Sequence, residues 1–279
     1  MDILELLKYL LLGLIQGLAE VLPVSSTGQV ELVRSLIGVD VEKELLFLIL
    51  LNTGSFIVLL FAFRRQIGVL IRDFFRYIFS GKSHPESKPG FVYCIKLILA
   101  TLPAAVVGLF FRHKIDGFLL NYGTLFSGIG LLVTGTVLLY VGFGDYRHQN
   151  GKIGWLDSVL IGAGQALALI PGISRSGMTT SIALKRGVDI DSALDFSFLM
   201  YLPVSFGGLV LLLLEASGSG FSVPSPSHYV YYAVAFLGAA GFTYLAFRII
   251  YNVFRSGKLK YFGYFCLATG ILSLIVYAF

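Results

Sequence analysis

Six apolar runs of 19 to 21 residues divide the chain and leave few ways for it to fold. They cover residues 45–63, 91–111, 125–143, 196–214, 229–247 and 261–279. A helix rises about 1.5 Å per residue and a bilayer core is about 30 Å thick, so each run can cross a membrane. Charged residues make up 13% of the chain, against about 25% in soluble domains. The sequence therefore predicts an all-α integral membrane protein.

Two further apolar runs are too short to cross a bilayer comfortably. Residues 9–22 would reach only about 21 Å as a helix, residues 158–170 are no longer, and Pro23 and Pro171 follow them. We expect each run to be the descending half of a re-entrant helical hairpin, with the tips at residues 24–28 and 174–176. For the first run, a single kinked spanning helix is the alternative.

The two short runs also resemble each other at an offset of 149 residues. Six of the sixteen positions from Gly13 to Gly28 are identical to their counterparts in the second run. Each half of the chain, residues 1–143 and 152–279, then contains one hairpin and three spans. Because three is an odd number, the halves must have opposite orientations. This predicts a single membrane domain built as an inverted repeat, with the two tips meeting near the middle of the bilayer.

Basic loops predict which side of the membrane each segment faces. Loops 64–90, 145–152 and 255–260 carry Lys and Arg, whereas the linker 215–228 carries none. Basic loops stay inside, which places both chain termini outside. The first hairpin then enters from the outside and the second from the cytoplasm. The chain has a net charge of +5, but its Lys and Arg cluster in loops between apolar runs, the ordinary pattern of a membrane protein. Nucleic acid is therefore not an expected partner.

Polar side chains gather at the first tip. Gln16 and Glu20 are spaced i, i+4 and share one helix face, and Ser25, Ser26 and Thr27 follow them. A carboxylate at membrane depth usually has a function, and Glu20 could bind a divalent cation or act as a base. Alternatively, Glu20 is solvated near the headgroups, and one of the two serines caps the second half-helix.

The second tip, within residues 171–179, holds an arginine between two serines and two glycines. Hydroxyl and N–H groups at a helix start bind phosphate oxygens, and Arg175 could add a bidentate charged contact. Its other interpretation is a structural ion pair with Glu20, which an empty phosphate site can also hold. Asn52 either lines the same cavity or makes an interhelical hydrogen bond. Tyr201, its counterpart in the repeat, is expected in the core.

Together these motifs resemble those of the undecaprenyl-diphosphate phosphatases, also known as bacitracin-resistance proteins. The family pattern is Glu or Gln, a Glu four residues later, and Leu-Pro-Ile/Val-Ser-Ser-x-Gly-His, with Pro-Gly-x-Ser-Arg-Ser-Gly-x-Thr far downstream. The first motif stands here as Gln16, Glu20 and residues 22–29, and the second is complete at residues 171–179. The resemblance covers the whole chain. It implies removal of the terminal phosphate from a C55 polyprenyl diphosphate, which recycles the lipid carrier for cell-wall glycans.

The resemblance also implies roles for single residues. Ser26 matches the proposed nucleophile, with direct attack by water as the alternative. Glu20 matches the metal-binding or activating carboxylate, and Arg175 would stabilise charge in the transition state. The expected substrate-binding residues are Gln16, Ser25, Thr27, Gln29, Asn52, Ser174, Ser176, Gly177 and Thr179. A divalent cation, Mg²⁺ or Ca²⁺, is the expected cofactor and would bind at Glu20. The expected partners are the polyprenyl diphosphate and membrane lipids, with a homodimer as the assembly considered. The expected location is the plasma membrane, with the active site towards its outer face.

One position departs from the family pattern. Gln29 stands where the family has histidine, and an amide cannot take up a proton near pH 7. A positioned base is worth roughly 10²–10⁴-fold in rate. Three outcomes therefore stay open: a slow phosphatase, a phosphatase in which Glu20 is the base, or a protein that only binds polyprenyl phosphate or flips it across the membrane.

Overall fold

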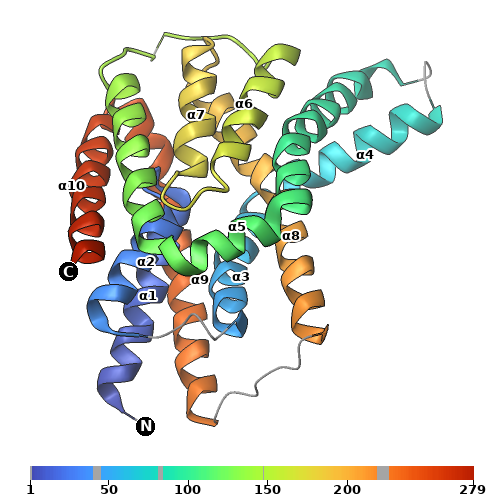
Figure 1. Cartoon of the computed structure of the whole chain (residues 1–279). Coiled ribbons are helices and arrows are strands. Elements are labelled where there is room, and N and C mark those ends of the chain that lie inside the picture. Colours follow the sequence, from blue (N-terminus) through green and yellow to red (C-terminus); the bar gives the residue numbers. More distant parts are fainter. Residues whose placement is uncertain (1, 40–44, 81–83, 147, 219–225) are drawn as a thin grey trace.

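The computed structural model is built of helices and describes residues 2–39, 45–80, 84–146, 148–218 and 226–279 (Figure 1). The helices are α1 (Ile3–Val21), α2 (Ser26–Ile37), α3 (Leu45–Ala62), α4 (Arg64–Ser80), α5 (Lys88–Gly142), α6 (Trp155–Leu167), α7 (Arg175–Lys185), α8 (Ile190–Gly218), α9 (Pro226–Arg255) and α10 (Leu259–Ala278), with the 3-10 turn η2 (Pro85–Ser87) before α5. The predicted all-α class is confirmed. The predicted linker 215–228 lies partly outside the described residues.

Five helical segments among the described residues are long and apolar enough to cross a membrane. They are Pro85–Phe110, Tyr122–Gly142, Ile190–Leu211, His228–Arg255 and Leu259–Ala278. Helices α3 and α4 form a sixth candidate span if they are counted together, although they are bent by 68° where they meet. The chain is thus a multi-pass membrane protein, as the apolar runs predict.

The prediction of a loop over residues 64–90 is wrong, because most of it is α4. Its basic residues alternate with apolar ones at helical spacing, so the apolar side chains fall on one face. That face packs against α5, where the ring of Phe74 stacks on Phe91 with centroids 5.5 Å apart. Counting charges predicted a loop, and the 3.6-residue period of the apolar side chains explains the helix.

Helix α1 is longer than the apolar run that predicts it. Asp2 caps its start by accepting a hydrogen bond from the Leu4 N–H at 2.9 Å. Lys8 and Glu5 then pair on its surface at 2.8 Å, an arrangement that supports a polar first turn. As a result α1 has 19 residues, against 13 in α6.

Two helical hairpins approach each other from opposite ends of the bundle (Figure 1). Helices α1 and α2 form the first, with both outer ends towards the bottom of the view, and α6 and α7 form the second, with both outer ends at the top. The tips touch, since Ser176 Oγ donates to the Leu22 carbonyl at 3.3 Å. A Cβ on Gly28 would lie 3.0 Å from Cα of Gly172, so glycine permits the close approach.

Equivalent contacts attach each hairpin to the other half of the chain. A Cβ on Gly13 of α1 would overlap the backbone of Ala235 on α9, and a Cβ on Gly162 of α6 would overlap that of Ala100 on α5. The two alanines differ by 135 in residue number, and the two glycines by 149. The same kind of contact, a glycine of a hairpin against the backbone of an alanine, thus occurs in both halves of the chain.

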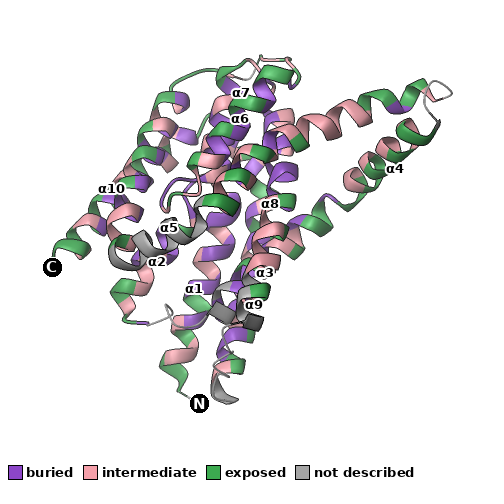
Figure 2. Cartoon of the chain, turned by 45° about the vertical axis from the view of Figure 1, so that its right-hand side comes forward, coloured by how far each residue is buried: buried purple, intermediate pink, exposed green. Residues whose placement is uncertain are grey.

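Buried side chains form two clusters around these hairpins. The larger includes α7 and α8, and the smaller joins α1, α3 and α9 through the rings of Tyr9, Phe47, Tyr231 and Tyr232. Figure 2 shows many buried residues on α6 and α7, whereas α4 carries mostly exposed and half-buried ones. Many large apolar side chains are exposed on the outside of the bundle, as expected for surfaces in contact with lipid.

Gly130 on α5 offers a test of how tightly the second tip is held. A Cβ there would lie 2.8 Å from Cα of Gly172, so Gly130→Ala should displace the tip and lower the free energy of unfolding by about 1–3 kcal/mol. Thermal unfolding in detergent measures this change. Gly241→Ala is the control, because its Cβ would meet nothing within 4 Å. Equal melting temperatures for the two variants would contradict the prediction.

Candidate functional site

The N-terminal ends of two helices face each other where the tips meet. Each helix, α2 and α7, is preceded by a capping serine. Ser25 Oγ accepts a hydrogen bond from the Gly28 N–H at 3.3 Å, and Ser174 Oγ accepts one from the Gly177 N–H at 3.1 Å. A helix N-terminus carries unpaired N–H groups and a partial positive charge. Two such ends directed at one space favour an anion between them.

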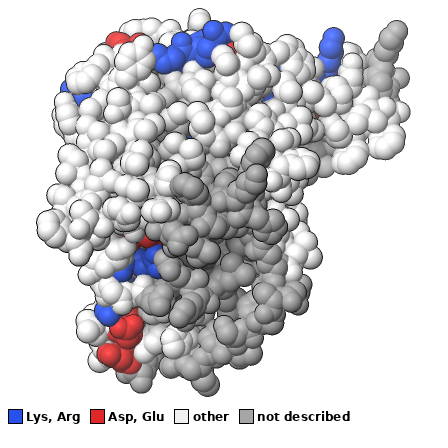
Figure 3. Space-filling view, in the orientation of Figure 1, with Lys and Arg blue, Asp and Glu red and all other residues white. Residues whose placement is uncertain are grey.

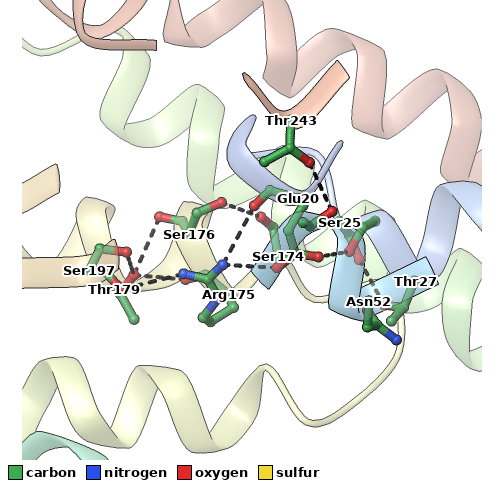
Figure 4. Close-up of polar contacts among 12 residues, drawn as sticks. Glu20, Ser25, Thr27, Asn52, Ser174, Arg175, Ser176, Thr179, Ser197 and Thr243 are labelled. Atoms are coloured by element: carbon green, nitrogen blue, oxygen red, sulfur yellow. Dashed lines mark hydrogen bonds and ion pairs between the residues drawn. The ribbon is translucent and has the colours of Figure 1, made fainter. Parts of the chain in front are cut away.

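A cavity of about 170 Å³ lies between the two ends. Its lining consists of Ala19, Glu20, Ser25, Ser26, Thr27, Asn52, Ala168, Ile173, Ser174, Arg175 and Ser176. Figure 4 shows that these polar side chains come from both hairpins and from α3. The structure therefore brings together all three predicted catalytic residues and five of the predicted substrate-binding ones.

Glu20 is the centre of the hydrogen-bond network. Its Oε2 accepts from Ser26 Oγ at 2.7 Å and from Gln16 Nε2 at 2.9 Å. Its Oε1 pairs with Arg175 Nη2 at 3.0 Å. The residue is 9% exposed, so the alternative of a carboxylate solvated near the headgroups is wrong. A buried charge needs such partners because desolvation is expensive.

Asn52 fulfils both of its proposed roles. Its Oδ1 accepts a hydrogen bond from Gln16 Nε2 at 3.1 Å, which links α3 to α1. The residue also lines the cavity. Gln16 itself does not line the cavity but holds Glu20 and Asn52 in place.

Arg175 is held by groups that the sequence motifs do not include. Its guanidinium lies over the ring of Tyr201, 4.1 Å from the ring centroid, and Nη1 donates to the Ser197 carbonyl at 3.4 Å. Tyr201 is buried as expected for a core residue, yet it also gives the cation a π surface. Tyr201 is the repeat counterpart of Asn52, and this position in the sequence could have identified Tyr201 as a residue of the site. Thr179 supports the same region, because its hydroxyl lies 2.6 Å from Ser197 Oγ.

Two threonines hold the tips from behind. Thr134 Oγ1 on α5 donates to the Gly172 carbonyl and accepts from the Ser174 N–H, both at 2.9 Å. Thr269 Oγ1 on α10 accepts from Gln29 Nε2 at 3.0 Å. Thr134 and Thr269 differ by 135 in residue number, as the two alanines do. No motif marks them, and only the packing of distant helices reveals them.

Backbone strain is concentrated at the first tip. Ser25 has a φ of 63°, and among the described residues it is the only one other than glycine with a positive φ. Such a conformation is uncommon for a residue with a side chain and costs on the order of 1–3 kcal/mol. The sharp turn brings the start of α2 directly after the end of α1, which directs Ser26 at Glu20. Ser25 is thus the capping serine and Ser26 the one directed at the carboxylate.

The oxygen ligands in the cavity could hold a metal ion only together with a substrate. Among the described residues, no group of three or more His, Cys, Asp and Glu side chains could hold a metal ion. Mg²⁺ is commonly held by one or two carboxylates together with substrate phosphates and water. Glu20, with the Asn52 amide oxygen beside it, offers such a partial ligand set.

Gln29 does not line the cavity, and neither do Gly177 and Thr179. The Gln29 amide is buried behind the tip, where it also donates to the Val24 carbonyl at 3.2 Å. A histidine at this position would face the same two acceptors. It would then help to hold the tip and would not meet the substrate directly.

We therefore expect Gln29→His to change the catalytic rate by less than about threefold, far below the roughly 10²–10⁴-fold effect of a positioned base. The measurement is phosphate release by the purified variant between pH 5 and 9, with Thr269→Val as a second probe of the same contact. A gain above tenfold, together with a new titration near the ordinary imidazole pKa of about 6.5, would contradict this placement.

Comparison with known proteins adds independent information. Residues 9–272 match a family described as "Bacitracin resistance protein BacA". A Bacillus cereus protein named undecaprenyl-diphosphatase 1 is 38% identical over 270 residues, which are 96% of this chain and 97% of that protein. The undecaprenyl-diphosphatase of Oceanobacillus iheyensis is 36% identical over 97% of this chain and 96% of its own. Undecaprenyl-diphosphatase 1 of Bacillus licheniformis is 37% identical over 99% of both chains.

Proposed function

Because the chain belongs to the bacitracin resistance protein BacA family, we propose that it is an undecaprenyl-diphosphate phosphatase. It removes the terminal phosphate of the membrane-bound lipid and leaves undecaprenyl phosphate, the carrier used again in cell-envelope glycan synthesis. Relatives that carry this name match nearly the full length of the chain.

A single observation supports this function most directly. Two capped helix N-termini, a guanidinium and a hydroxyl paired with a carboxylate all face one small cavity. The positive groups fit a diphosphate, which carries several negative charges and many acceptor oxygens. The Ser26–Glu20 pair supplies a nucleophile next to a base, the arrangement that phosphoryl transfer to a serine requires.

In the proposed reaction, Ser26 Oγ attacks the terminal phosphorus. The bond between that phosphorus and the bridging oxygen breaks, and the serine proton passes to Glu20 Oε2, which lies 2.7 Å away. Undecaprenyl phosphate leaves with the bridging oxygen and the electron pair. Arg175 and the N-terminus of α7 stabilise the negative charge as it shifts. Water then attacks the phosphorus of the phosphoserine, the bond to Ser26 Oγ breaks, and Glu20 returns its proton to that oxygen. Phosphate is released with the oxygen of the water, and the serine hydroxyl and the carboxylate are both restored.

We also propose that Glu20 would hold a divalent cation, Mg²⁺ or Ca²⁺, when the diphosphate is present. When bound, it neutralises negative charge on the phosphate oxygens. Arg175 pairs with the same carboxylate at 3.0 Å. In our proposal, substrate phosphate takes over the guanidinium and leaves a Glu20 oxygen for the cation.

The site faces the outer side of the membrane in this proposal. Lys and Arg side chains gather at the upper end of the molecule in Figure 3, the end at which the second hairpin has its outer ends. Such residues usually stay on the cytoplasmic side. The first hairpin has its outer ends at the other end of the molecule (Figure 1), so in this proposal it opens towards the outside.

The test is phosphate release from undecaprenyl diphosphate by purified protein, with Mg²⁺, Ca²⁺ or chelator present. The Bacillus cereus relative serves as the reference in the same assay. Cation-dependent release that Ser26→Ala abolishes is the expected result. If this chain releases no phosphate under conditions in which the relative is active, the proposal fails. Lipid translocation in vesicles without phosphate release would instead identify a flippase.

A further inference from the structure

A large apolar groove lies on the same side of the bundle as α4. It has a volume of about 770 Å³, within the range of about 300–1,000 Å³ that is common for ligand sites. Apolar side chains of α3, α4, α5 and α8 line it, including Phe56, Ile71, Ile98, Leu202 and Phe206. Helix α4 is bent by 68° relative to α3 and extends away from the rest of the bundle (Figure 1).

The groove offers no free hydrogen-bonding side chain among its described lining residues. Thr101 Oγ1 donates to the Leu97 carbonyl at 2.8 Å, and Cys94 Sγ donates to the Leu70 carbonyl at 3.5 Å. The remaining lining residues are hydrocarbon in character. The occupant is therefore apolar, because a polar group placed here would lose its hydrogen bonds to water.

Shared residues connect the groove to the polar cavity. Asn52 lines the cavity and also a middle pocket between α3 and α8. Phe56 lines the middle pocket and also the groove, and Leu60 follows it there. These three residues are spaced i, i+4 and i+8, so they share one face of α3. The face changes from polar to apolar as it leaves the cavity.

We infer that the polyprenyl tail of the substrate leaves the cavity between α3 and α8 and lies in this groove. The inference rests on the proposed function, since it takes the diphosphate to be in the polar cavity. A molecule with an anionic head and an apolar tail matches the polarity along this path. A second copy of the chain could cover the groove, but that would leave the connection to the cavity unexplained.

We expect the groove to affect the orientation of the bound substrate more than the affinity of the protein for that substrate. A tail in the bilayer is already surrounded by hydrocarbon, so moving it onto an apolar protein surface gains little free energy. Confining the first part of the tail instead restricts the directions from which the diphosphate can meet Ser26. Orientation of this kind acts on kcat/KM.

Gly208 and Gly207 on α8 provide a matched pair of variants. A Cβ on either glycine would meet nothing within 4 Å, but only Gly208 lines the middle pocket. Gly208→Leu fills the path, whereas Gly207→Leu adds the same side chain beside it. Thermal unfolding of both variants checks that each is folded.

We expect Gly208→Leu to lower kcat/KM for undecaprenyl diphosphate by roughly tenfold, or about 1.4 kcal/mol. For isopentenyl diphosphate, whose tail has five carbons, kcat/KM should fall by less than about twofold, because so short a tail does not reach the filled pocket. Gly207→Leu should match the wild type with both substrates. If the two variants behave alike, or if Gly208→Leu affects both substrates equally, the inference is wrong.

A photoreactive probe tests the inference even if the chain releases no phosphate. A farnesyl diphosphate analogue with a diazirine at the end of its tail is activated on the wild-type protein in vesicles, and labelled peptides are identified by mass spectrometry. Labels on α3, α4, α5 or α8 at the groove, suppressed by undecaprenyl diphosphate, support the tail path. Labels confined to α9 or α10, or the absence of labels at the groove, overturn it.

Discussion

Replacing Arg175 with alanine should lower kcat/KM for undecaprenyl diphosphate by roughly 10²- to 10³-fold, as removal of one group that stabilises transition-state charge commonly does. Among the described residues that line the cavity, Arg175 is the only one with a positively charged side chain. Its guanidinium comes from the second hairpin but pairs with Glu20 on the first at 3.0 Å. The loss would remove charge stabilisation where the terminal phosphate is transferred. Steady-state phosphate release measures it.

Arg175→Lys separates charge from geometry. Lysine keeps the positive charge but cannot form two parallel hydrogen bonds or stack in the same way on Tyr201. We expect this variant to fall between wild type and Arg175→Ala. Arg255→Ala is the control, because Arg255 pairs with Asp191 on an exposed surface where such pairs contribute little. The proposed role of Arg175 is wrong if the alanine variant keeps more than a tenth of wild-type activity.

Glu20→Gln should have an effect at least as large, roughly 10²- to 10⁴-fold in kcat. The amide has nearly the same shape but cannot take the proton of Ser26, whose Oγ lies 2.7 Å from the carboxylate. It is also a weak ligand for a divalent cation. The measurement is phosphate release as a function of Mg²⁺ concentration, with Asp191→Asn as the control. A variant with normal kcat and normal cation dependence would rule out both roles of Glu20.

The double variant Arg175→Ala, Glu20→Gln distinguishes stability from catalysis. Each single change leaves one buried charge without its partner, which typically costs about 3–5 kcal/mol, whereas removing both charges is often close to neutral. The double variant should therefore unfold at a higher temperature than either single one. Its activity should stay at the level of the poorer single variant. If the double variant recovered both stability and activity, the Arg175–Glu20 pair would have a structural role and no catalytic one.

The sequence predicted the class of fold because that depends on local properties. A charge-free run of 19 residues crosses a bilayer wherever it lies in the chain, and a proline ends a helix without help from distant residues. The two hairpin tips at Pro23 and Pro171 therefore lie close to the predicted positions. The prediction for α4 was wrong because a count of charges ignores their helical spacing.

The candidate site could be predicted as a set of residues but not as an arrangement. Glu20, Ser26 and Arg175 follow from motifs and line one cavity. Gln29 belongs to the same motif, yet its amide bonds to Thr269 behind the tip. Tyr201 belongs to no motif, yet its ring holds the arginine. Which way a side chain points depends on how each helix is rotated against its neighbours, and neighbours far apart in sequence determine that rotation.

The amino-acid sequence by itself determined that this protein lies in a membrane, that two broken helices interrupt its spans, and that an acid, a serine and an arginine lie at their tips. Apolar run length, proline and local motif spacing are sufficient for these conclusions. The tertiary structure alone decided that the N-termini of α2 and α7 converge on one cavity and that an apolar groove continues from it. Both features arise where helices from opposite halves of the chain pack together, and no local stretch of sequence contains that contact.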